Sequence, residues 1–271
     1  MSEDLCLYDV NDGVAVLTLN RPARNNAWNG ELGNAYFDRL EQADADRSVK
    51  AIVVTGAGKS FCPGADMDVL SGIQERGGER DDRPPRPMTH ALNVRKPLIG
   101  AINGACAGLG LVQAMLLDVR FAAAGAKFTT AFARRGLIAE HSVSWTMTRV
   151  VGTAVALDLL MSARVFTAEE ARELGVVNYV VPRDEVLDAA TAYARDLAQN
   201  VSPASMATIK RQVYSHLGTD VQTALDESNA YMKESLVGPD FKEGVRSYLD
   251  KRTPDFAPLG EGTQYDWLSN G

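Results

Sequence analysis

Hydrophobic residues change their spacing several times along this chain, and each spacing predicts a different element. Near the N-terminus, two short apolar runs, Leu5–Val10 and Val14–Leu19, are separated by Asn11-Asp12-Gly13, residues that tolerate positive φ. This arrangement predicts a β-hairpin. Apolar residues then recur at helical spacing through Trp28–Ala45, which predicts an amphipathic helix.

Short apolar or β-branched runs bounded by glycine or proline predict buried strands farther along the chain. These runs lie at Ala51–Thr55, Leu98–Ile102, Val119–Ala123 and Val176–Val181. Helices are predicted at Leu109–Leu117, where the residues are apolar, and at Val143–Met161, with a break near Gly152. Strands and helices therefore alternate through most of the chain.

The last part of the chain has the pattern of helices alone. Thr167 and Glu170 form a capping box that opens a short helix, and residues 184–250 keep a helical pattern interrupted at glycine and proline. Alternating strands and helices followed by helices indicate an α/β core and a helical C-terminal part. We expect the core to span residues 1–198 and the helical region to span residues 199–271.

Composition and charge narrow the class of protein. The chain has 271 residues, 45% of them hydrophobic, and three cysteines, which fit neither a disulfide framework nor a zinc site. Its net charge of −7 disfavours nucleic acid and anionic membranes as partners. Met1–Val10 has no pattern of a targeting segment, and no apolar run approaches about 18 residues, so we expect a cytoplasmic protein. Arg76–Thr89, rich in Arg, Asp, Gly and Pro, predicts a mobile surface loop.

Several familiar motifs are absent from the sequence. Gly58-Lys59-Ser60 follows a predicted strand, but a P-loop needs glycine five residues before Gly58, where this chain has Val53. No G-x-S-x-G sequence marks a hydrolase serine. His90, His141 and His216 lack the spacing of a metal site, so we expect no metal.

Two turns rich in small residues are candidates for ligand binding. Phe61–Met67 follows one predicted strand, and Ile102–Gly110 follows another. Small side chains let a ligand approach backbone N–H groups, and Leu109 would lie at a helix N-terminus, which favours negative charge. One N–H group from each turn could bind a single carbonyl oxygen. The alternative is that both segments are only tight strand-to-helix turns.

A third segment, Arg135–Trp145, carries a single acid, Glu140, between an apolar run and an apolar helix. A glutamate in such a place can act as a general acid and base. It can equally be a charge that the helix N-terminus favours. The residues alone leave both interpretations open.

Five motifs follow one another along roughly residues 5–257. They are Asn20-Arg21-Pro22 with Asn26-Ala27, Phe61–Asp66, Ile102-Asn103-Gly104 with Gly108-Leu109, Phe241–Gly244, and Lys251-Arg252 with Pro254 and Phe256. In order and spacing the set resembles the enoyl-CoA hydratase/isomerase (crotonase) superfamily. The resemblance implies a spiral of ββα turns and a C-terminal helical region that forms a homotrimer or a dimer of trimers. It also implies an acyl-CoA thioester substrate, with coenzyme A as part of the substrate and no separate cofactor.

The resemblance also implies the chemistry of the two turns. By motif position, the backbone N–H groups of Ala65 and Leu109 would form an oxyanion hole, beside Gly64 and Gly108 in the substrate site. Two such donors stabilise the negative charge on a thioester oxygen when a proton leaves the neighbouring carbon. One donor of this kind is typically worth about 10²–10³ in rate.

Two positions depart from the hydratase pattern. Typical hydratases carry a pair of glutamates that handle water, and the matching places here are Val112 and about Phe132. The setting of Glu140 instead resembles the Δ3,Δ2-enoyl-CoA isomerase branch, in which one acid moves a proton from C2 to C4. We expect Val112, Phe132 and Trp145 to form an apolar pocket that raises the pKa of Glu140, while the helix N-terminus opposes that shift.

Other residues have both a substrate-binding and a structural interpretation. Arg24 would contact a CoA phosphate or be solvated, and Asp66 would lie at the substrate and stabilise its turn. Trp28 would shape the acyl tunnel or pack in the core, and His141 would assist Glu140 or lie on the helix face. Three functions remain open: an isomerase using Glu140, a hydratase using Glu140 alone or with His141, and a catalytically weak acyl-CoA binding protein.

Overall fold

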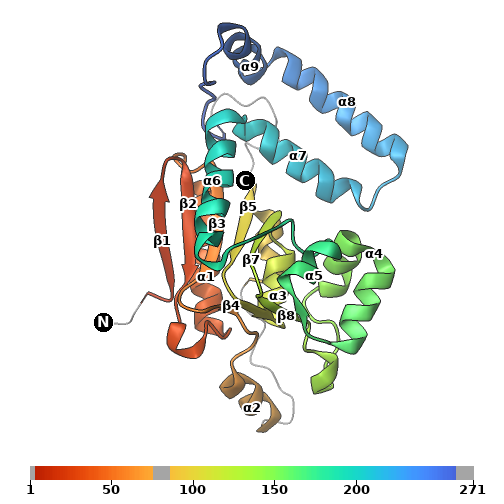
Figure 1. Ribbon diagram of the computed structural model, residues 1–271. Coiled ribbons are helices and arrows are strands. Elements are labelled where there is room, and N and C mark those ends of the chain that lie inside the picture. The colour runs from red at the N-terminus through yellow and green to blue at the C-terminus, as the bar shows by residue number, and fades with distance from the viewer. Residues whose placement is uncertain (1–3, 76–85, 261–271) are drawn as a thin grey trace.

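The computed structural model describes residues 4–75 and 86–260, and these residues form two β-sheets surrounded by helices (Figure 1). The strands of the larger sheet are, in order across it, β1 (Cys6–Asn11), β2 (Val14–Leu19), β3 (Ala51–Gly56), β5 (Leu98–Ile102), β7 (Val119–Ala123) and β10 (Tyr179–Val181). β1 and β2 form the predicted antiparallel hairpin, whereas the pairs from β2 to β10 are parallel. Every residue of β3 is buried, so this strand lies in the hydrophobic core.

A smaller sheet is built from strands that come shortly after strands of the larger one. Its strands are, in order across it, β4 (Ser60–Cys62), β6 (Ala105–Ala107), β8 (Lys127–Thr129) and β9 (Phe166–Thr167). The chain passes from β3 to β4, from β5 to β6 and from β7 to β8, so each turn adds one strand to each sheet. A helical segment then leads to the next turn, which confirms the expected spiral of ββα turns.

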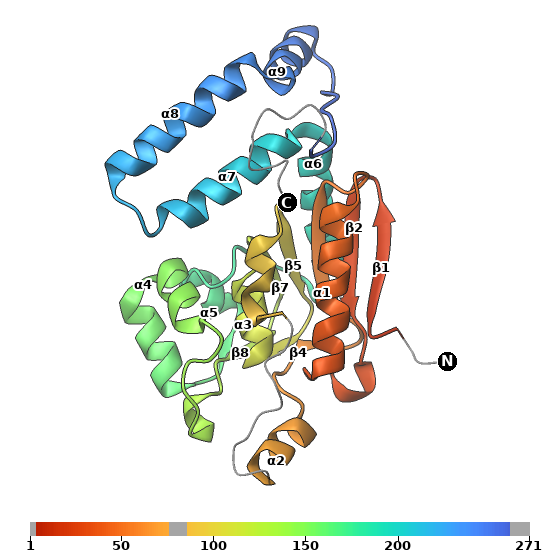
Figure 2. The same cartoon turned by 180° about the vertical axis from the view of Figure 1, so that it is seen from behind.

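Helices cover both faces of the larger sheet and extend beyond one of its ends. The α-helices are α1 (Gly30–Ala45), α2 (Met67–Glu75), α3 (Leu109–Met115), α4 (Val143–Ser162), α5 (Ala168–Glu173), α6 (Val186–Asn200), α7 (Pro203–His216), α8 (Val221–Val237) and α9 (Pro239–Asp250). Short 3-10 helices are η1 (Pro22–Arg24), η2 (Met88–Asn93), η3 (Ala133–Arg135) and η4 (Arg183–Glu185). α6 packs against β2, β3, β5 and β7 and is seen in front in Figure 1, while α1 lies on the opposite face, seen in front in Figure 2. None of the described helices is long and apolar enough to cross a membrane.

The structure confirms most of the predicted elements and shifts some of their ends. α1 begins at Gly30 because the Asn29 side chain accepts a hydrogen bond from Leu32 N and caps the helix there. The predicted break in α4 lies at Gly152, whose backbone is non-helical. The last predicted strand is shorter than expected, since only Tyr179–Val181 pairs with β7. α2 and the strands of the smaller sheet were not predicted.

The segment predicted as a mobile loop, Arg76–Thr89, is not a loop throughout. Its first ten residues lie outside the described part of the chain. Arg86 forms ion pairs with Asp38 at 2.6 Å and with Glu41 at 3.1 Å on α1, and Met88 is buried at the start of η2. The prediction was therefore wrong for the end of the segment, where these contacts attach the chain to the core.

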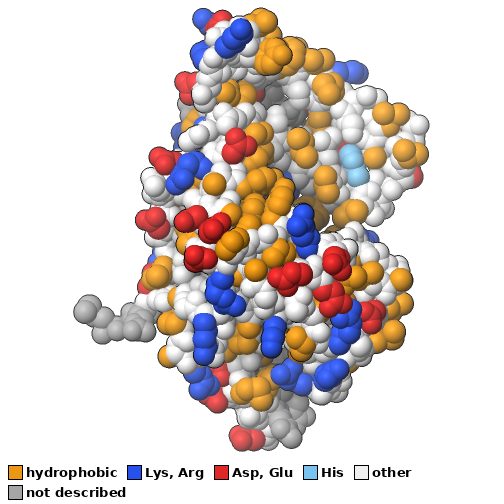
Figure 3. All heavy atoms as spheres, viewed as in Figure 1, with side chains coloured by type: hydrophobic (Ala, Val, Ile, Leu, Met, Phe, Trp, Pro, Cys, Tyr) orange, Lys and Arg blue, Asp and Glu red, His pale blue; other side chains and the backbone are white. Residues whose placement is uncertain are grey.

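The C-terminal part of the chain is helical, as predicted, and it exposes apolar side chains. α7 and α9 both pack against α8 beyond the end of the larger sheet (Figure 1). α8, which lies wholly within the described residues, has no buried residue. Val221, Met232, Tyr248 and Leu249 are all more than half exposed, and Figure 3 shows hydrophobic side chains over α8 and α9. The expected domain boundary at residue 198 stays a prediction.

Candidate active site

The two turns of small residues lie side by side because the strands before them pair. β4 and β6 are parallel neighbours in the smaller sheet. A methyl group added at Gly64 would lie 3.1 Å from the Ala107 carbonyl oxygen, and one added at Gly108 would lie 3.6 Å from Gly64 Cα. The backbones of the two turns are therefore in contact immediately before the two candidate oxyanion donors.

The N–H group of Ala65 is positioned by a short backbone bridge to Trp28. Trp28 N donates to the Gly64 carbonyl oxygen at 2.7 Å, and Asp66 N donates to the Trp28 carbonyl oxygen at 2.8 Å. Successive peptide groups of an extended segment point in opposite directions, so the Ala65 N–H faces away from Trp28. Within the described residues it donates no hydrogen bond, and it is available to a ligand.

The N–H group of Leu109 lies in the first turn of α3. The first N–H groups of a helix have no acceptor within the helix, and no acceptor for Leu109 N is found in the described part of the chain. α3 lies directly against β4 here, because a methyl group added at Gly110 would be only 2.1 Å from the Cys62 carbonyl oxygen. Only glycine permits so close an approach, so the place of the Leu109 donor depends on Gly110.

Asp66 is a buried carboxylate that joins the Ala65 turn to the segment of η1. Its oxygen atoms lie 2.7 Å from Arg24 Nη2 and 3.0 Å from Arg21 Nη2. The hydrogen bond from Arg24, with further bonds from Asp68 N and Arg21, lowers the pKa of Asp66 to about 2. Arg24 also lies 2.5 Å from Asp68. These contacts give Asp66 a structural role in the turn. Arg24 forms ion pairs with two carboxylates at once.

Arg21 and Asn26 support the site, although sequence reasoning used them only as part of a family motif. The buried Asn26 side chain accepts a hydrogen bond from Arg21 N at 2.9 Å. Its amide nitrogen donates to the carbonyl oxygens of Ala57 at 2.9 Å and Ser60 at 2.8 Å. Asn26 therefore fixes the start of β4, the strand that leads to the Ala65 turn.

A cavity of about 510 Å³ opens beside the Ala65 donor. It is lined by Ala23, Arg24, Asn25, Ala27, Pro63, Ala65, Asp66, Met67, Asp68 and Arg135. The structure thus brings one oxyanion donor and two arginines to a single cavity. Arg135, at the end of η3, was not predicted from the sequence, because it belongs to none of the motifs.

Glu140 lies in the loop between η3 and α4, with 15% of its side chain exposed. Its Oε2 is 3.3 Å from Nε2 of His141. His141 and Ser142 have φ angles of 50° and 66°, a conformation that costs residues other than glycine of order 1–3 kcal/mol each. The surrounding contacts maintain this strained loop, because Ala139 packs against the core and Val143 is fully buried. The backbone on both sides of Glu140 is therefore anchored.

Val112 and Phe132 are buried apolar residues on the two segments that flank the second turn. The N–H of Val112, in α3, donates to the Gly108 carbonyl oxygen at 3.0 Å. Phe132 follows β8, and Gly108 N donates to the carbonyl oxygen of Thr129 at the end of that strand, at 3.1 Å. Neither side chain has a group that could orient or deprotonate a water molecule.

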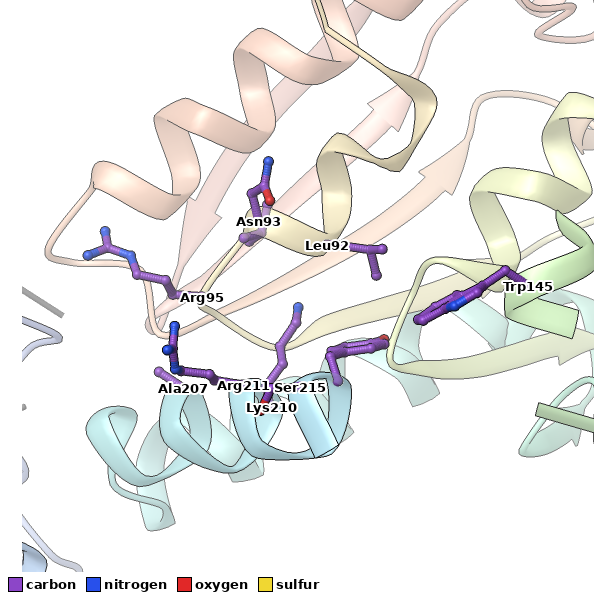
Figure 4. A pocket seen from close by; sticks show the side chains of 10 residues that line it. Leu92, Asn93, Arg95, Trp145, Ala207, Lys210, Arg211 and Ser215 are labelled. Carbon is purple, nitrogen blue, oxygen red and sulfur yellow. The ribbon is translucent and has the colours of Figure 1, made fainter. Parts of the chain in front are cut away.

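Trp145 lines a different cavity, of about 530 Å³, shown in Figure 4. The side chains around it come from η2, α4 and α7 and the residues next to them: Leu92, Asn93, Val94, Arg95, Trp145, Ala207, Lys210, Arg211, Tyr214 and Ser215. The ring of Trp28 packs in the core, edge-on to Tyr36 at 5.7 Å between ring centroids. The structure therefore places neither indole with Arg24 in the cavity beside Ala65, and contact of either with an acyl chain stays a prediction.

Known proteins resemble this chain along nearly its whole length. A family model described as "Enoyl-CoA hydratase/isomerase" matches residues 9–258. The chain is 34% identical over 259 residues to "1,2-epoxyphenylacetyl-CoA isomerase" of Escherichia coli, covering 93% of this chain and 98% of that protein. It is 36% identical over 249 residues to "Enoyl-CoA hydratase ACTT3" of Alternaria alternata, covering 90% of this chain and 83% of that one. A crystal structure of a probable enoyl-CoA hydratase/isomerase from Mycobacterium abscessus is similar with a TM-score of 0.86 at 32% identity, covering 93% of this chain and 98% of that one.

The spiral of paired strands, with its contacting turns, is the crotonase fold, as the solved relative and the family match show. The protein is an enzyme of the isomerase and hydratase class within that superfamily. The chain belongs to the enoyl-CoA hydratase/isomerase family.

Proposed function

We propose that this enzyme converts a 3-enoyl-CoA into the conjugated 2-enoyl-CoA, with Glu140 moving the proton. One observation carries the proposal: the two places for the hydratase glutamates hold the buried apolar residues Val112 and Phe132. The acid of the segment is instead Glu140, largely withdrawn from solvent at 15% side-chain exposure. A double-bond shift needs one acid–base group and one oxyanion hole, and needs no activated water.

In the proposed reaction, the N–H groups of Ala65 and Leu109 bind the thioester oxygen. Glu140 takes a proton from C2, and the electron pair forms an enolate whose negative charge lies on that oxygen. The C3–C4 double bond moves to C2–C3 as C4 receives the proton from Glu140. The carboxylate is regenerated, so the reaction consumes no other group. The α3 N-terminus beside Leu109 adds a favourable dipole for the enolate.

The proposal also includes the oligomeric state and the cellular compartment of the enzyme. The enzyme would work on an acyl-CoA, without a separate cofactor, as a cytoplasmic homotrimer or dimer of trimers. The exposed apolar side chains of α8 and α9 support association, because contiguous apolar surface of this kind commonly marks a protein interface. The surface they offer includes Tyr248, which is 83% exposed.

Hydration of a 2-enoyl-CoA is the second candidate function. Glu140 and His141 lie 3.3 Å apart, and together they could orient one water molecule. Relatives such as the Alternaria protein carry a hydratase name. A third candidate is an acyl-CoA binding protein with weak activity, which the missing glutamates at Val112 and Phe132 favour.

The test uses purified wild-type, Glu140→Gln and His141→Gln proteins with a 3-enoyl-CoA and, separately, a 2-enoyl-CoA. The absorbance of the conjugated thioester reports both reactions, rising on isomerisation and falling on hydration. We expect the wild type to isomerise the 3-enoyl-CoA and Glu140→Gln to slow this step by about 10²–10⁴. Glu173→Gln changes an exposed acid on α5 and should keep the wild-type rate.

The other outcomes separate the alternatives. An unchanged isomerisation rate in Glu140→Gln contradicts the proposed mechanism. Loss of conjugated absorbance from the 2-enoyl-CoA, abolished in Glu140→Gln, would support the hydratase, and its loss in His141→Gln as well would show that His141 takes part. Tight binding of both esters by the wild type, without turnover of either, would support the binding protein.

A further inference from the structure

We propose that Arg135 binds a phosphate group of the coenzyme A moiety. This inference rests on the proposed function only in taking the ligand to be a CoA thioester. It does not depend on whether the thioester is isomerised or hydrated. Arg135 belongs to none of the motifs that identified the family, and its assignment comes from its place in the cavity beside Ala65.

The backbone of η3 places Arg135 in the lining of that cavity. Arg135 ends η3, where its N–H donates to the Phe132 carbonyl oxygen at 2.9 Å, and Gly136 N donates to the Ala133 carbonyl oxygen at 3.2 Å. This closed turn fixes the Cα of Arg135, while its exposed side chain lines the cavity with Ala65 and Arg24. The side chain makes one long hydrogen bond, from Nη1 to the Ala131 carbonyl oxygen at 3.4 Å.

Charge pairing distinguishes Arg135 from the other arginines at this site. Arg21 and Arg24 both bind Asp66, and Arg24 also binds Asp68. Asp66 is ionised at neutral pH, since its pKa is about 2. No carboxylate of the described residues forms an ion pair with Arg135. Among the described residues, Arg21 and the cavity lining thus supply three guanidinium groups and two carboxylates, and Arg135 is the one guanidinium of the three without a carboxylate partner there.

A phosphate is the ligand group that this arrangement fits. When the thioester oxygen is bound at the Ala65 N–H, the rest of the CoA chain must leave the donor through surrounding space, and the cavity of about 510 Å³ supplies such space. A planar guanidinium presents two parallel N–H donors that match the oxygens of a phosphate. In a protein with a net charge of −7, a locally unpaired cation is also what attracts a multiply charged anion.

The test measures the dissociation constant of free CoA by titration calorimetry at low ionic strength. We expect Arg135→Gln to weaken CoA binding by about five- to tenfold, since the pair is charge-assisted but partly exposed to solvent. Arg135→Lys should recover part of the affinity. Arg134→Gln is the matched control, because Arg134 is the preceding residue of η3, bonds to the Ser162 carbonyl oxygen at 3.0 Å and is not part of the cavity lining; it should bind CoA like the wild type.

Smaller ligands locate the phosphate. If Arg135→Gln loses its effect with dephospho-CoA, Arg135 binds the 3′-phosphate; if the effect persists there but vanishes with pantetheine, it binds the diphosphate. Either result supports the inference. It is overturned if Arg135→Gln, shown to be folded by circular dichroism, binds CoA like the wild type, or if the variant weakens pantetheine equally. These measurements involve no turnover, so an unchanged rate in Glu140→Gln would overturn the proposed reaction and leave this inference standing.

Discussion

At the scale of single residues, the site depends on side chains that hold backbone in place as much as on those that meet a ligand. Asp66 shows this most clearly. Its buried carboxylate forms ion pairs with Arg21 and Arg24, which both lie in the segment of η1. These ion pairs connect that segment to the turn that contains the Ala65 N–H group. A charge that supports a turn in this way makes the geometry of the site sensitive to pH.

Asp66→Asn should therefore destabilise the protein in a pH-dependent way. Folding lowers the pKa of Asp66 to about 2. The ion pairs therefore contribute their full stabilisation to the folded protein above about pH 4, and this contribution is lost as the pH falls from about 4 to 2. We expect urea unfolding to show a loss of about 1–2 kcal/mol at pH 7, after allowance for the half-exposed Arg24. The loss should shrink as the pH approaches 2.

Asp68→Asn is the control for this prediction. Its carboxylate also meets Arg24, but it is mostly exposed, so its replacement should change the free energy of unfolding by no more than about 0.5 kcal/mol. A loss in Asp66→Asn that is the same at pH 7 and pH 3 would contradict the assigned ionisation.

At the scale of elements, sequence patterns predicted the strands with enough residues to show a hydrophobic run. β3 and β5 are such strands, and both were expected within one residue of their ends. β4 and β6, with three residues each, are too short to show a period, yet their pairing brings the two turns together. Contact between the turns joins residues more than forty positions apart, such as Gly64 and Gly108, so no local pattern could reveal it.

Some residues of the candidate site were predicted from the sequence and others were not. Ala65 and Leu109 were predicted as donors from the positions of the family's motifs in the two small-residue turns, and Glu140 was predicted as the acid from its segment and its resemblance to the isomerase branch; their roles stay predictions. Arg135 was not predicted, because the role proposed for it depends on which neighbouring carboxylates already form ion pairs. That information exists only when segments from η1, the Ala65 turn and η3 are seen together.

Lys96 connects two elements of the core and gives a prediction at this scale. The buried ammonium donates to the carbonyl oxygens of Ala43 at 2.7 Å and Asp46 at 2.6 Å, at the C-terminus of α1. Helix C-termini leave carbonyl groups without partners, and a cation there also opposes the negative end of the dipole. Burial lowers the pKa of Lys96 to about 8, which still leaves it mostly protonated at pH 7.

Lys96→Met should lower the free energy of unfolding by about 1–3 kcal/mol, because it keeps much of the side-chain volume and removes the donor from buried carbonyl groups. Chemical denaturation followed by far-UV circular dichroism measures this. Lys127→Met, at an exposed position in β8, controls for the loss of a positive charge and should stay within about 0.5 kcal/mol of the wild type. Equal stability of Lys96→Met and the wild type would show that the ammonium does not stabilise α1.

At the scale of the whole molecule, the C-terminal helices differ from the spiral core. The core strands β3, β4 and β5 are fully buried, whereas α8 contacts the rest of the chain without burying any of its residues, all of which the structure describes. A helix of this kind gains little stability from its own chain, since most helical stability in proteins comes from packing an apolar face. Its apolar residues favour a partner surface.

We therefore expect light scattering on the eluted protein to give three or six chain masses. Replacing two exposed apolar residues of α9, as in Tyr248→Glu with Leu249→Glu, should shift the protein toward the single chain, because burying two unpaired carboxylates in an interface is costly. Lys233→Glu, at an exposed position of α8, controls for added negative charge. A wild-type protein that stays a single chain at all concentrations would contradict the proposed assembly.

The close contact between α3 and β4 has a consequence for engineering the enzyme. Because Gly110 approaches the Cys62 carbonyl oxygen too closely for any side chain, α3 and β4 meet here through main chain alone, and a substitution at Gly110 would move the Leu109 N–H group. In the proposed reaction the side chains expected near the acyl group are Val112, Phe132 and those of the Glu140 loop, so we expect substrate range to vary with these positions. A library of variants at those positions, with both turns kept constant, would change the substrate range of the enzyme without changing the groups proposed for the reaction.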